Sequence, residues 1–279
     1  MHLRTKLNRN APPGAYRRRV VQWPTMPDRY ANDAEFYDLI HEFHDDDTGL
    51  WLSFAGRTDQ PVLEVGTGTG RIALGLARGG HEVVGIDPSP AMLAIARQAA
   101  EDEAIDVTFI EGRVLDLSLE AGHYGLIIIP ADVFLYCTDG HEQIAMLGLL
   151  AEALAFNGVL AVDLPGPAAW LDDTTNGQPL LVYSGELEGG THLDTWHVHE
   201  DDLSLQTRTL RVIYDLLGKD GTLRRQQSEH LLRYVYRFEI EYLLRFAGLA
   251  LSDVYGDYDL GPLTNGSDRM VVIARRTTG

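Results

Sequence analysis

The sequence has little cysteine and no long apolar run. Cys137 is the single cysteine among 279 residues, which excludes an intrachain disulfide and fits the reducing cytoplasm in which we expect the protein to reside. No apolar run approaches the ~20 residues that a membrane-spanning helix needs, so we expect no membrane partner. The basic residues at 17–19 are not followed by an apolar segment and do not form an export signal.

Basic residues are scarce beyond the first 25 positions. The chain has 23 Lys and Arg against 41 Asp and Glu, for a net charge of −18. The first 25 residues contribute +6 to this total, which leaves −24 for the remainder. So acidic a body repels a phosphate backbone, which makes nucleic acid an unlikely main substrate. We expect residues 1–25 to form a disordered basic arm and residues 26–279 to form one domain.

Short apolar strands alternate with helices over residues 61–163. We expect strands at Pro61–Gly66, Glu82–Ile86, Val107–Glu111, Tyr124–Ile129 and Gly158–Asp163, and helices at Asp33–Phe54, Arg71–Arg78, Pro90–Ala100 and His141–Ala155. With two further strands near the C-terminus, this alternation predicts an α/β fold. The expected architecture is a doubly wound, Rossmann-like, mostly parallel sheet of seven strands with helices on both faces.

The pattern changes after residue 165. Strands are expected at Leu181–Tyr183, His192–His199, Leu203–Leu216 and Thr222–Tyr236, with turns but no helices between them. They predict a late antiparallel β-meander over residues 180–236. Residues 237–279 then close the domain with a helix and strands, expected at Phe238–Ala247, Leu251–Tyr255 and Met270–Ala274.

The stretch GTGTG lies between the first expected strand and the following helix. Glycines there allow a ligand to approach the backbone and the N–H groups at the helix start. A dinucleotide fingerprint, G-x-G-x-x-G, requires a glycine where Arg71 stands. Glu64 precedes the first glycine by two residues and would repel a phosphate. The motif therefore disfavours a nicotinamide oxidoreductase and favours a cationic ligand.

Two longer motifs carry a resemblance to a known family. VLEVGTGTGRIALGLA followed by VVGIDPSPAMLAIA resembles the first two motifs of class I S-adenosylmethionine-dependent methyltransferases. The match continues through FIEGRVLDL, LIIIPADVFLY and GVLAVDLPGP and covers about residues 30–165, the expected cofactor-binding core. The meander resembles the substrate-covering sheet of small-molecule N-methyltransferases that act on glycine or amino sugars. The resemblance implies S-adenosylmethionine as the cofactor.

The resemblance also implies which residues contact the cofactor: Tyr37, Glu64, Gly66, Gly68, Gly70, Arg71, Asp87, Met92, Val114 and Pro130. The three glycines would clear space for the methionine moiety and adenosine. Glu64 would attract the ammonium, and Asp87 would accept hydrogen bonds from the ribose hydroxyls. Arg113 stands where the family often has an acid, so the backbone at Val114 would hold the adenine. Pro130 opens the PADVFLY segment.

Three of these residues have a second interpretation. Tyr37 would either close over the sulfonium through a cation–π contact or serve as a core aromatic. Met92 would lie under the adenine or in the core. Arg71 would pair with the cofactor carboxylate or remain solvated in the first turn of its helix.

Candidates for acceptor chemistry lie in PADVFLY and in the meander. Asp132 is predicted as a base or an anchor for an amine, with a helix cap as the alternative. His199, or His230 on the neighbouring strand, is a second candidate base. The residues expected to line a substrate pocket are Trp196, Arg233 and Tyr236. Strand alternation places Arg233 on the face opposite to Tyr236.

Two polar stretches are assigned no chemistry. In HLDTWHVHE, His197 and His199 share a strand face but Asp194 falls on the other, and no cysteine contributes, so we expect no metal. The acidic run at 45–47 is expected to be a solvated surface segment.

These observations favour an S-adenosylmethionine-dependent methyltransferase that acts on N or O of a small molecule. One alternative is a methyltransferase for RNA or protein, with the basic arm as a docking element, although the charge of the body opposes it. Another is a non-catalytic cofactor-binding or scaffold protein of the same fold. The sequence leaves open whether the chain forms a homo-oligomer.

Overall fold

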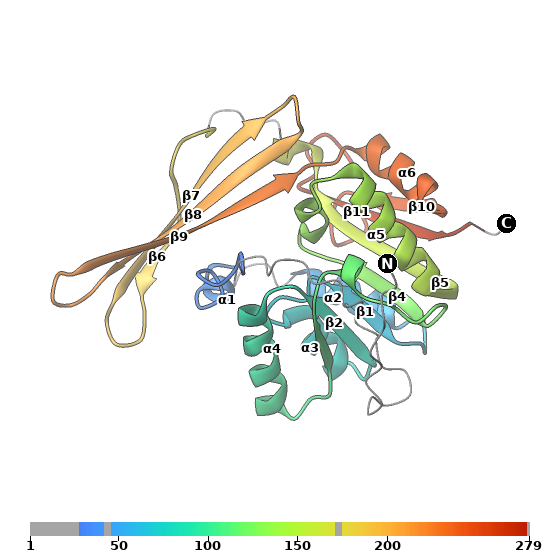
Figure 1. Cartoon of the computed structure of the whole chain (residues 1–279), viewed down its shortest axis with the longest axis horizontal. Helices are drawn as coiled ribbons and strands as arrows, with labels where there is room; N and C mark the ends of the chain where they lie inside the picture. Colours follow the sequence, from blue (N-terminus) through green and yellow to red (C-terminus); the bar gives the residue numbers. More distant parts are fainter. Residues whose placement is uncertain (1–27, 42–45, 171–174, 278–279) are drawn as a thin grey trace, which may run out of the picture.

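Two β-sheets organise the chain (Figure 1). The computed structural model describes residues 28–41, 46–170 and 175–277, and the predicted basic arm 1–25 lies outside this range. No helix within the described residues is long and apolar enough to cross a membrane.

Sheet A has seven strands and carries the core. In spatial order they are β10 (Leu249–Tyr255), β11 (Arg269–Arg276), β5 (Leu154–Pro165), β4 (Tyr124–Ile129), β1 (Val62–Val65), β2 (Val83–Asp87) and β3 (Thr108–Glu111). Strands β1 to β5 pair in parallel, whereas β11 runs antiparallel to both of its neighbours. Every residue of β1, β2 and β4 is buried, as expected for a parallel sheet covered on both faces. The predicted Rossmann-like sheet is confirmed.

Helices cover both faces of sheet A. The helical elements are α1 (Tyr37–Ile40), α2 (Asp46–Ala55), α3 (Arg71–Arg78), α4 (Pro90–Glu103), α5 (Gly140–Ala153), α6 (Arg237–Phe246) and the short 3-10 turns η1 (Val114–Asp116), η2 (Val133–Tyr136) and η3 (Pro167–Trp170). Trp51 of α2 and Leu76 of α3 belong to the core on one face. Leu147 of α5 and Leu244 of α6 belong to the core on the other. Helix α4 begins where Ser89 Oγ accepts the Met92 N–H, 3.1 Å away.

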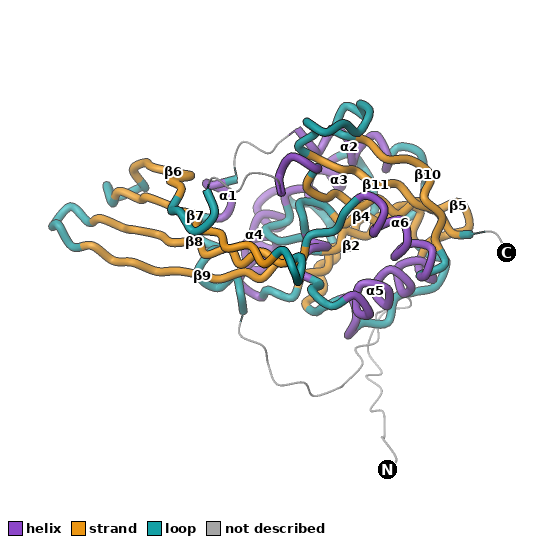
Figure 2. Tube along the Cα trace, turned by 90° about the horizontal axis from the view of Figure 1, so that it is seen from above, coloured by secondary structure: helices purple, strands orange, loops and turns teal. Residues whose placement is uncertain are grey.

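Sheet B is the predicted antiparallel meander, inserted between β5 and α6. Its strands, in order, are β6 (Leu180–Glu186), β7 (His192–Asp202), β8 (Thr207–Leu217) and β9 (Leu223–Arg233). They form a long twisted ribbon that projects from the α/β body (Figures 1 and 2). Cross-strand pairing aligns Thr195 with Tyr214, and Leu210 with His230, so these side chains share one face. We call it the inner face, because the linking segment described next packs against it.

Residues 28–40, which we call the linking segment, connect the two sheets. At one end Asp28 accepts hydrogen bonds from Ser89 Oγ (3.0 Å) and from the Ala91 N–H (3.2 Å) at the start of α4. Further along, Phe36 is 2% exposed and packs against Tyr214 of sheet B, with ring centroids 5.2 Å apart. One short piece of chain therefore touches both sheets.

The sequence prediction of a single helix over Asp33–Phe54 is wrong. Residues 29–36 form turns, followed by α1 and, after residues outside the described range, by α2. Asp33 and Phe36 are held by sheet B instead, and these tertiary contacts outweigh the local helical spacing. Several strand limits also differ from the predicted ones, among them those of β8 and β9. Strand β8 starts at Thr207 because Asp202 Oδ1 accepts the N–H groups of a turn after β7, and β9 ends at Arg233.

Candidate active site

The loop between β1 and α3 has an unusual backbone. Gly66, Gly68 and Gly70 all have positive φ, at 77°, 55° and 86°, a region that L residues with a side chain rarely adopt. The Gly66 N–H donates to the Ile86 carbonyl of β2 over 2.7 Å, which fixes the start of the loop. A Cβ built on Gly68 would meet nothing within 4 Å. The loop therefore combines a fixed backbone with open space at its centre.

Asp87 ends β2 beside this loop and is 7% exposed. Its Oδ2 accepts the Gly68 N–H (2.9 Å) and its Oδ1 accepts the Ser89 N–H (2.8 Å). Burial raises the pKa of Asp87, while the two N–H donors oppose the shift and the nearby Asp28 adds to it. Each carboxylate oxygen retains capacity to accept a further hydrogen bond. The position suits the recognition of a pair of hydroxyls.

Glu64 lies inside β1 and is only 1% exposed. Its Oε2 accepts a hydrogen bond from Thr67 Oγ1 over 2.8 Å. Burial raises the pKa of Glu64 to about 8, against the opposing effects of Thr67 and Arg71. The group is therefore mostly protonated at pH 7 and would ionise when a cation binds beside it.

Arg71, the first residue of α3, pairs with Asp47 of α2. Its two terminal nitrogens lie 2.5 and 2.9 Å from the two carboxylate oxygens. Asp47 also accepts a hydrogen bond from Trp51 Nε1 at 3.3 Å and is 2% exposed. The expectation that the acidic run is solvated is therefore wrong for Asp47. A contact between Arg71 and a cofactor carboxylate stays a prediction.

The remaining predicted cofactor residues come from several other elements. Met92 on α4 and Val114 in η1 are buried, at 2% and 4% exposure, and Pro130 directly follows β4 and is buried. Tyr37 stacks on the His41 ring at 4.2 Å. Burial is the main cause that raises the pKa of Tyr37 to about 12; Arg71 opposes it, while Asp38, Asp87 and Asp132 add to it. Tyr37 thus lies within electrostatic reach of Asp87 and Asp132, two of the three predicted acidic site residues.

Asp132 follows β4 in a left-handed conformation, with φ 66°. Its carboxylate is 2.6 Å from Arg269 Nη2. Arg269 also donates through Nε to Asp163, a fully buried carboxylate at the end of β5, over 2.9 Å. Asp163 in turn accepts the Ala131 N–H at 3.1 Å. This network fixes the turn that carries Asp132 and places one guanidinium between two carboxylates.

A buried polar cluster joins the linking segment to sheet B. Asp33 Oδ1 accepts hydrogen bonds from Tyr214 (2.7 Å) and Ser228 (2.5 Å), and its Oδ2 lies 3.0 Å from His230 Nε2. The His230 ring lies 4.9 Å from the Tyr30 ring. We call these residues, together with Tyr136, the Asp33 cluster.

Tyr136 of η2 connects the Asp33 cluster to the strand-end loops of sheet A. Its hydroxyl is 2.5 Å from the Tyr30 hydroxyl, and its ring meets His230 edge-on at 5.8 Å. The sequence analysis named the segment PADVFLY without assigning a role to its last residue, Tyr136, and placed Asp33 only at the start of an expected helix. The local spacing of Asp33 and Phe36 gave only a weak signal of this cluster, because the partners of Asp33, Tyr214 and His230, lie far along the chain.

The predicted residues of the meander fall on different faces of sheet B. His199 and His230 both pair with Leu210 and share the inner face, whereas Trp196 and Arg233 occupy the opposite face. Arg233 bonds to Gln143 of α5 and Glu239 of α6. The remaining candidate, Tyr236, is 48% exposed at the start of α6 and lies outside β9. The structure therefore groups the two histidines and separates them from the other three candidates.

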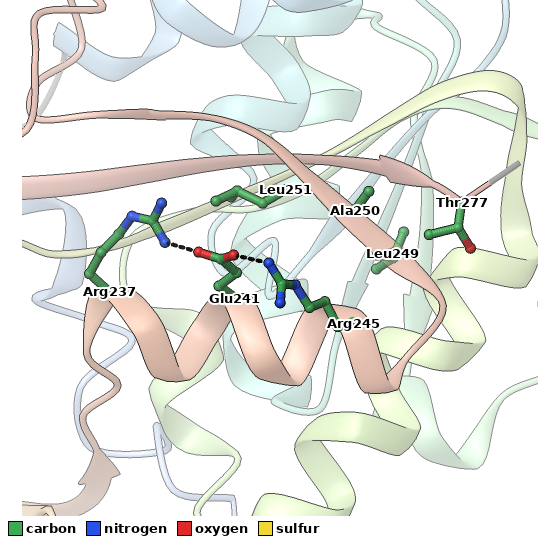
Figure 3. A pocket seen from close by; sticks show the side chains of 7 residues that line it. All are labelled: Arg237, Glu241, Arg245, Leu249, Ala250, Leu251 and Thr277. Atoms are coloured by element: carbon green, nitrogen blue, oxygen red, sulfur yellow. Dashed lines mark hydrogen bonds and ion pairs between the residues drawn. The ribbon is translucent and has the colours of Figure 1, made fainter.

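A pocket elsewhere is not part of this arrangement. It has a volume of about 390 Å³ and lies between α6 and the C-terminal strands (Figure 3). Glu241 accepts hydrogen bonds from Arg237 (2.8 Å) and from Arg245 within it. These ion pairs all lie on one surface of α6, and none of the predicted site residues lines this pocket.

The fold and the loop define a class of protein. A seven-stranded sheet with β11 antiparallel, a glycine loop after β1 and an acid at the end of β2 together describe a class I methyltransferase. Residues 62–158 match a family model described as a methyltransferase domain.

Similar proteins extend this match over nearly the whole chain. The cypemycin N-terminal methyltransferase of a Streptomyces species is 27% identical over 263 residues, covering 91% of this chain and 98% of that protein. The CcbJ methyltransferase structure from Streptomyces caelestis is 26% identical with a TM-score of 0.70, covering 87% and 96% of the two chains. The sugar N-methyltransferase KedS8 from a Streptoalloteichus species shares the fold at 19% identity and TM-score 0.68, over 86% and 93%. Residues 62–158 therefore form a methyltransferase domain, and the chain is similar over most of its length to methyltransferases.

Proposed function

We propose that this methyltransferase transfers a methyl group to a nitrogen or oxygen atom of a small-molecule acceptor. The observation that carries the proposal is the Asp33 cluster. In this cluster His230 of sheet B contacts Asp33 and the Tyr30 ring, and Tyr30 is close enough to Asp87 for that carboxylate to contribute to its raised pKa. The names of the cypemycin N-terminal and sugar N-methyltransferases point to acceptors of this kind.

The residues of the Gly66–Gly70 loop fit S-adenosylmethionine, which supplies an electrophilic methyl group on a sulfonium when bound. Open space over Gly68 would accept the ligand beside a fixed backbone. Asp87 would accept the ribose hydroxyls with its remaining lone pairs. Glu64 would ionise against the ammonium, and Tyr37 would present its ring to the positive charge. The adenine end of the cofactor would be enclosed by three buried residues, Met92, Val114 and Pro130.

On the acceptor side, orientation is the main service that the protein provides. Asp132 is held by Arg269 and would serve as a base or as an anchor for an acceptor amine, the two roles predicted from the sequence. His199 remains a candidate base on the inner face of sheet B. Three further residues remain predicted pocket residues, although they lie away from the inner face. Trp196 and Arg233 are on the opposite face of sheet B, and Tyr236 is at the start of α6.

The proposal extends to the setting of the reaction. We propose residues 26–279 as one domain that works in the cytoplasm, supported by the free thiol of Cys137, which is buried. The net charge of −24 on the chain beyond its first 25 residues opposes nucleic acid as the acceptor. Sedimentation at several concentrations measures whether the chain forms a homo-oligomer.

Two measurements test the function. Calorimetry should show binding of S-adenosylmethionine and S-adenosylhomocysteine but not of NADH. Mass spectrometry should then detect a gain of one methyl group on a member of an acceptor panel: short peptides with a free N-terminal amine, amino sugars, their hydroxyl counterparts and a short RNA. Methylation of the RNA alone, or cofactor binding without turnover of any panel member, would overturn the proposal.

A further inference from the structure

His230 has the surroundings of a proton acceptor. We propose that its Nδ1 is the general base that deprotonates an amine acceptor, with Asp33 as the residue that positions it. This inference rests on the proposed function and specifies its acceptor class. The side chain of His230 is 3% exposed, as is that of Asp33, so the pair is buried.

The hydrogen bonds of Asp33 determine which ring nitrogen carries the proton. Burial alone would raise the pKa of Asp33, but hydrogen bonds from His230, Ser228 and Tyr214 outweigh it and lower the pKa. Asp33 is therefore a carboxylate, which accepts hydrogen bonds and donates none. His230 must then carry its proton on Nε2, 3.0 Å from Asp33 Oδ2. In the neutral ring, the lone pair is on Nδ1.

The other ring nitrogen of His230, Nδ1, is buried and makes no hydrogen bond to the described residues. A buried acceptor without a donor costs stability, and such exceptions call for an explanation. A donor on a bound acceptor would satisfy Nδ1.

Two tyrosines connect the His230 ring to the elements that carry the predicted cofactor residues. The His230 ring contacts Tyr30 from the linking segment and Tyr136 from η2. Asp87 contributes to the raised pKa of Tyr30, and Tyr37 and Asp132 contribute to that of Tyr136, after burial as the main cause in both. The two tyrosines therefore contact His230 and also lie within electrostatic range of residues expected to hold the cofactor.

Several titratable side chains lie near His230. The tyrosines that face it, Tyr30, Tyr136 and Tyr214, have pKa values raised by burial and stay neutral. His197 on β7, whose pKa is lowered to about 4 mainly by burial, with nearby His41 and His230 adding to the shift, is also neutral at pH 7. The anion that faces His230 is Asp33, which would stabilise the imidazolium after proton transfer.

These surroundings favour an amine over an alcohol. Aromatic rings and a carboxylate attract a cation, and an aliphatic amine arrives as an ammonium that has no lone pair for attack. In the proposed step an N–H bond of the ammonium breaks, an Nδ1–H bond forms, and the electron pair stays on the amine nitrogen. The imidazolium later returns its proton to solvent. An alcohol is far too weak an acid to give up its proton to imidazole in comparable amount.

The first test does not depend on turnover. Protein labelled with ¹⁵N-histidine and saturated with S-adenosylhomocysteine is titrated with alaninamide and with lactamide, which differ only in amine versus hydroxyl. We expect His230 Nδ1 to resonate as an unprotonated nitrogen, and alaninamide but not lactamide to move that resonance. His230→Gln assigns the signal. A protonated Nδ1 without probe, or no movement with alaninamide, would overturn the proposal.

The second test uses the amine acceptor found in the panel. His230→Gln should lower kcat at pH 7 by 100-fold or more, in the range of general-base catalysis, with unchanged affinity for S-adenosylmethionine. The deficit should shrink as pH rises and the amine deprotonates by itself. His141→Gln on the exposed start of α5 is the matched control and should keep full activity.

The outcomes separate this inference from the proposed function. A loss that is equal at every pH would show a structural role for His230 and overturn the base. Methylation of hydroxyl probes only would overturn the amine class. Both results leave a working methyltransferase, whereas failure of the wild-type chain to bind S-adenosylmethionine would refute the proposed function itself. Asp33→Asn should reproduce part of the loss in kcat and weaken the preference for the Nε2–H tautomer.

Discussion

Replacing Glu64 by Gln should change how stability depends on pH. The pKa of Glu64 is raised from 4.5 to about 8 in the folded protein. The folded state therefore holds this proton more tightly than the unfolded state. The stabilisation is complete below pH 4.5 and is lost as pH rises towards 8. With a slope of about 1.4 kcal/mol per pH unit, the free energy of unfolding contributed by Glu64 should fall by about 4 kcal/mol between pH 5 and pH 9.

The Glu64→Gln variant keeps the shape of the side chain and an oxygen for the Thr67 hydroxyl, but it cannot ionise. Urea denaturation of both proteins from pH 5 to pH 9, followed by tryptophan fluorescence, gives the difference between their unfolding free energies. All other titrating groups are shared and cancel in that difference. Parallel pH profiles would refute the assignment of a strongly raised pKa to Glu64.

Three further predictions concern the cofactor loop and its support. Asp87→Ala should weaken S-adenosylmethionine binding at least 100-fold in calorimetry, since each lost hydrogen bond to a charged acceptor contributes about 1.5–3 kcal/mol. Gly68→Ala should lower the free energy of unfolding by about 1–2 kcal/mol in urea denaturation, because φ 55° strains a residue with a Cβ. Asp47→Asn should destabilise the fold by about 2 kcal/mol, because the Arg71 guanidinium loses its charged partner.

Each of these predictions has a control and a contradictory result. Asp253→Ala, at an exposed position of β10, should leave cofactor affinity unchanged, and an equal loss in both aspartate variants would remove the specific role of Asp87. For Gly68, an unchanged midpoint would mean that the loop relaxes freely. For Asp47, the combined variant with Arg71→Met should recover part of the stability, and full additivity of the two changes would contradict the ion pair.

Local sequence patterns predicted sheet A and its loop well. The buried strands are apolar runs, and both α3 and β4 have the predicted limits. The glycine loop and Asp87 were found because their spacing is a property of a continuous stretch. Asp47 was missed because three consecutive aspartates look solvated, and its burial depends on Arg71, 24 residues away.

The acceptor side depends on contacts that no local pattern contains. Asp33 meets His230 across a sequence separation of 197 residues. The register of β7 to β9 decides that His230 faces the linking segment while Trp196 faces away. Alternation within one strand predicts which residues share a face, but it does not say which face is covered. The substrate-lining candidates were therefore chosen from both faces.

The cofactor is expected at sheet A and the acceptor is proposed at sheet B, and this separation has a consequence for how acceptor specificity can evolve. The residues expected to hold the cofactor lie at strand ends and loops of sheet A, where a change of backbone would disturb the fold. The inner face of sheet B presents alternate residues of long regular strands, such as Thr195, Val212 and Ser228. Side chains at these positions can be exchanged one at a time without altering the glycine loop. If sheet B holds the acceptor, as we propose, the same cofactor-binding body would serve acceptors of different shape, with sheet B as its variable part.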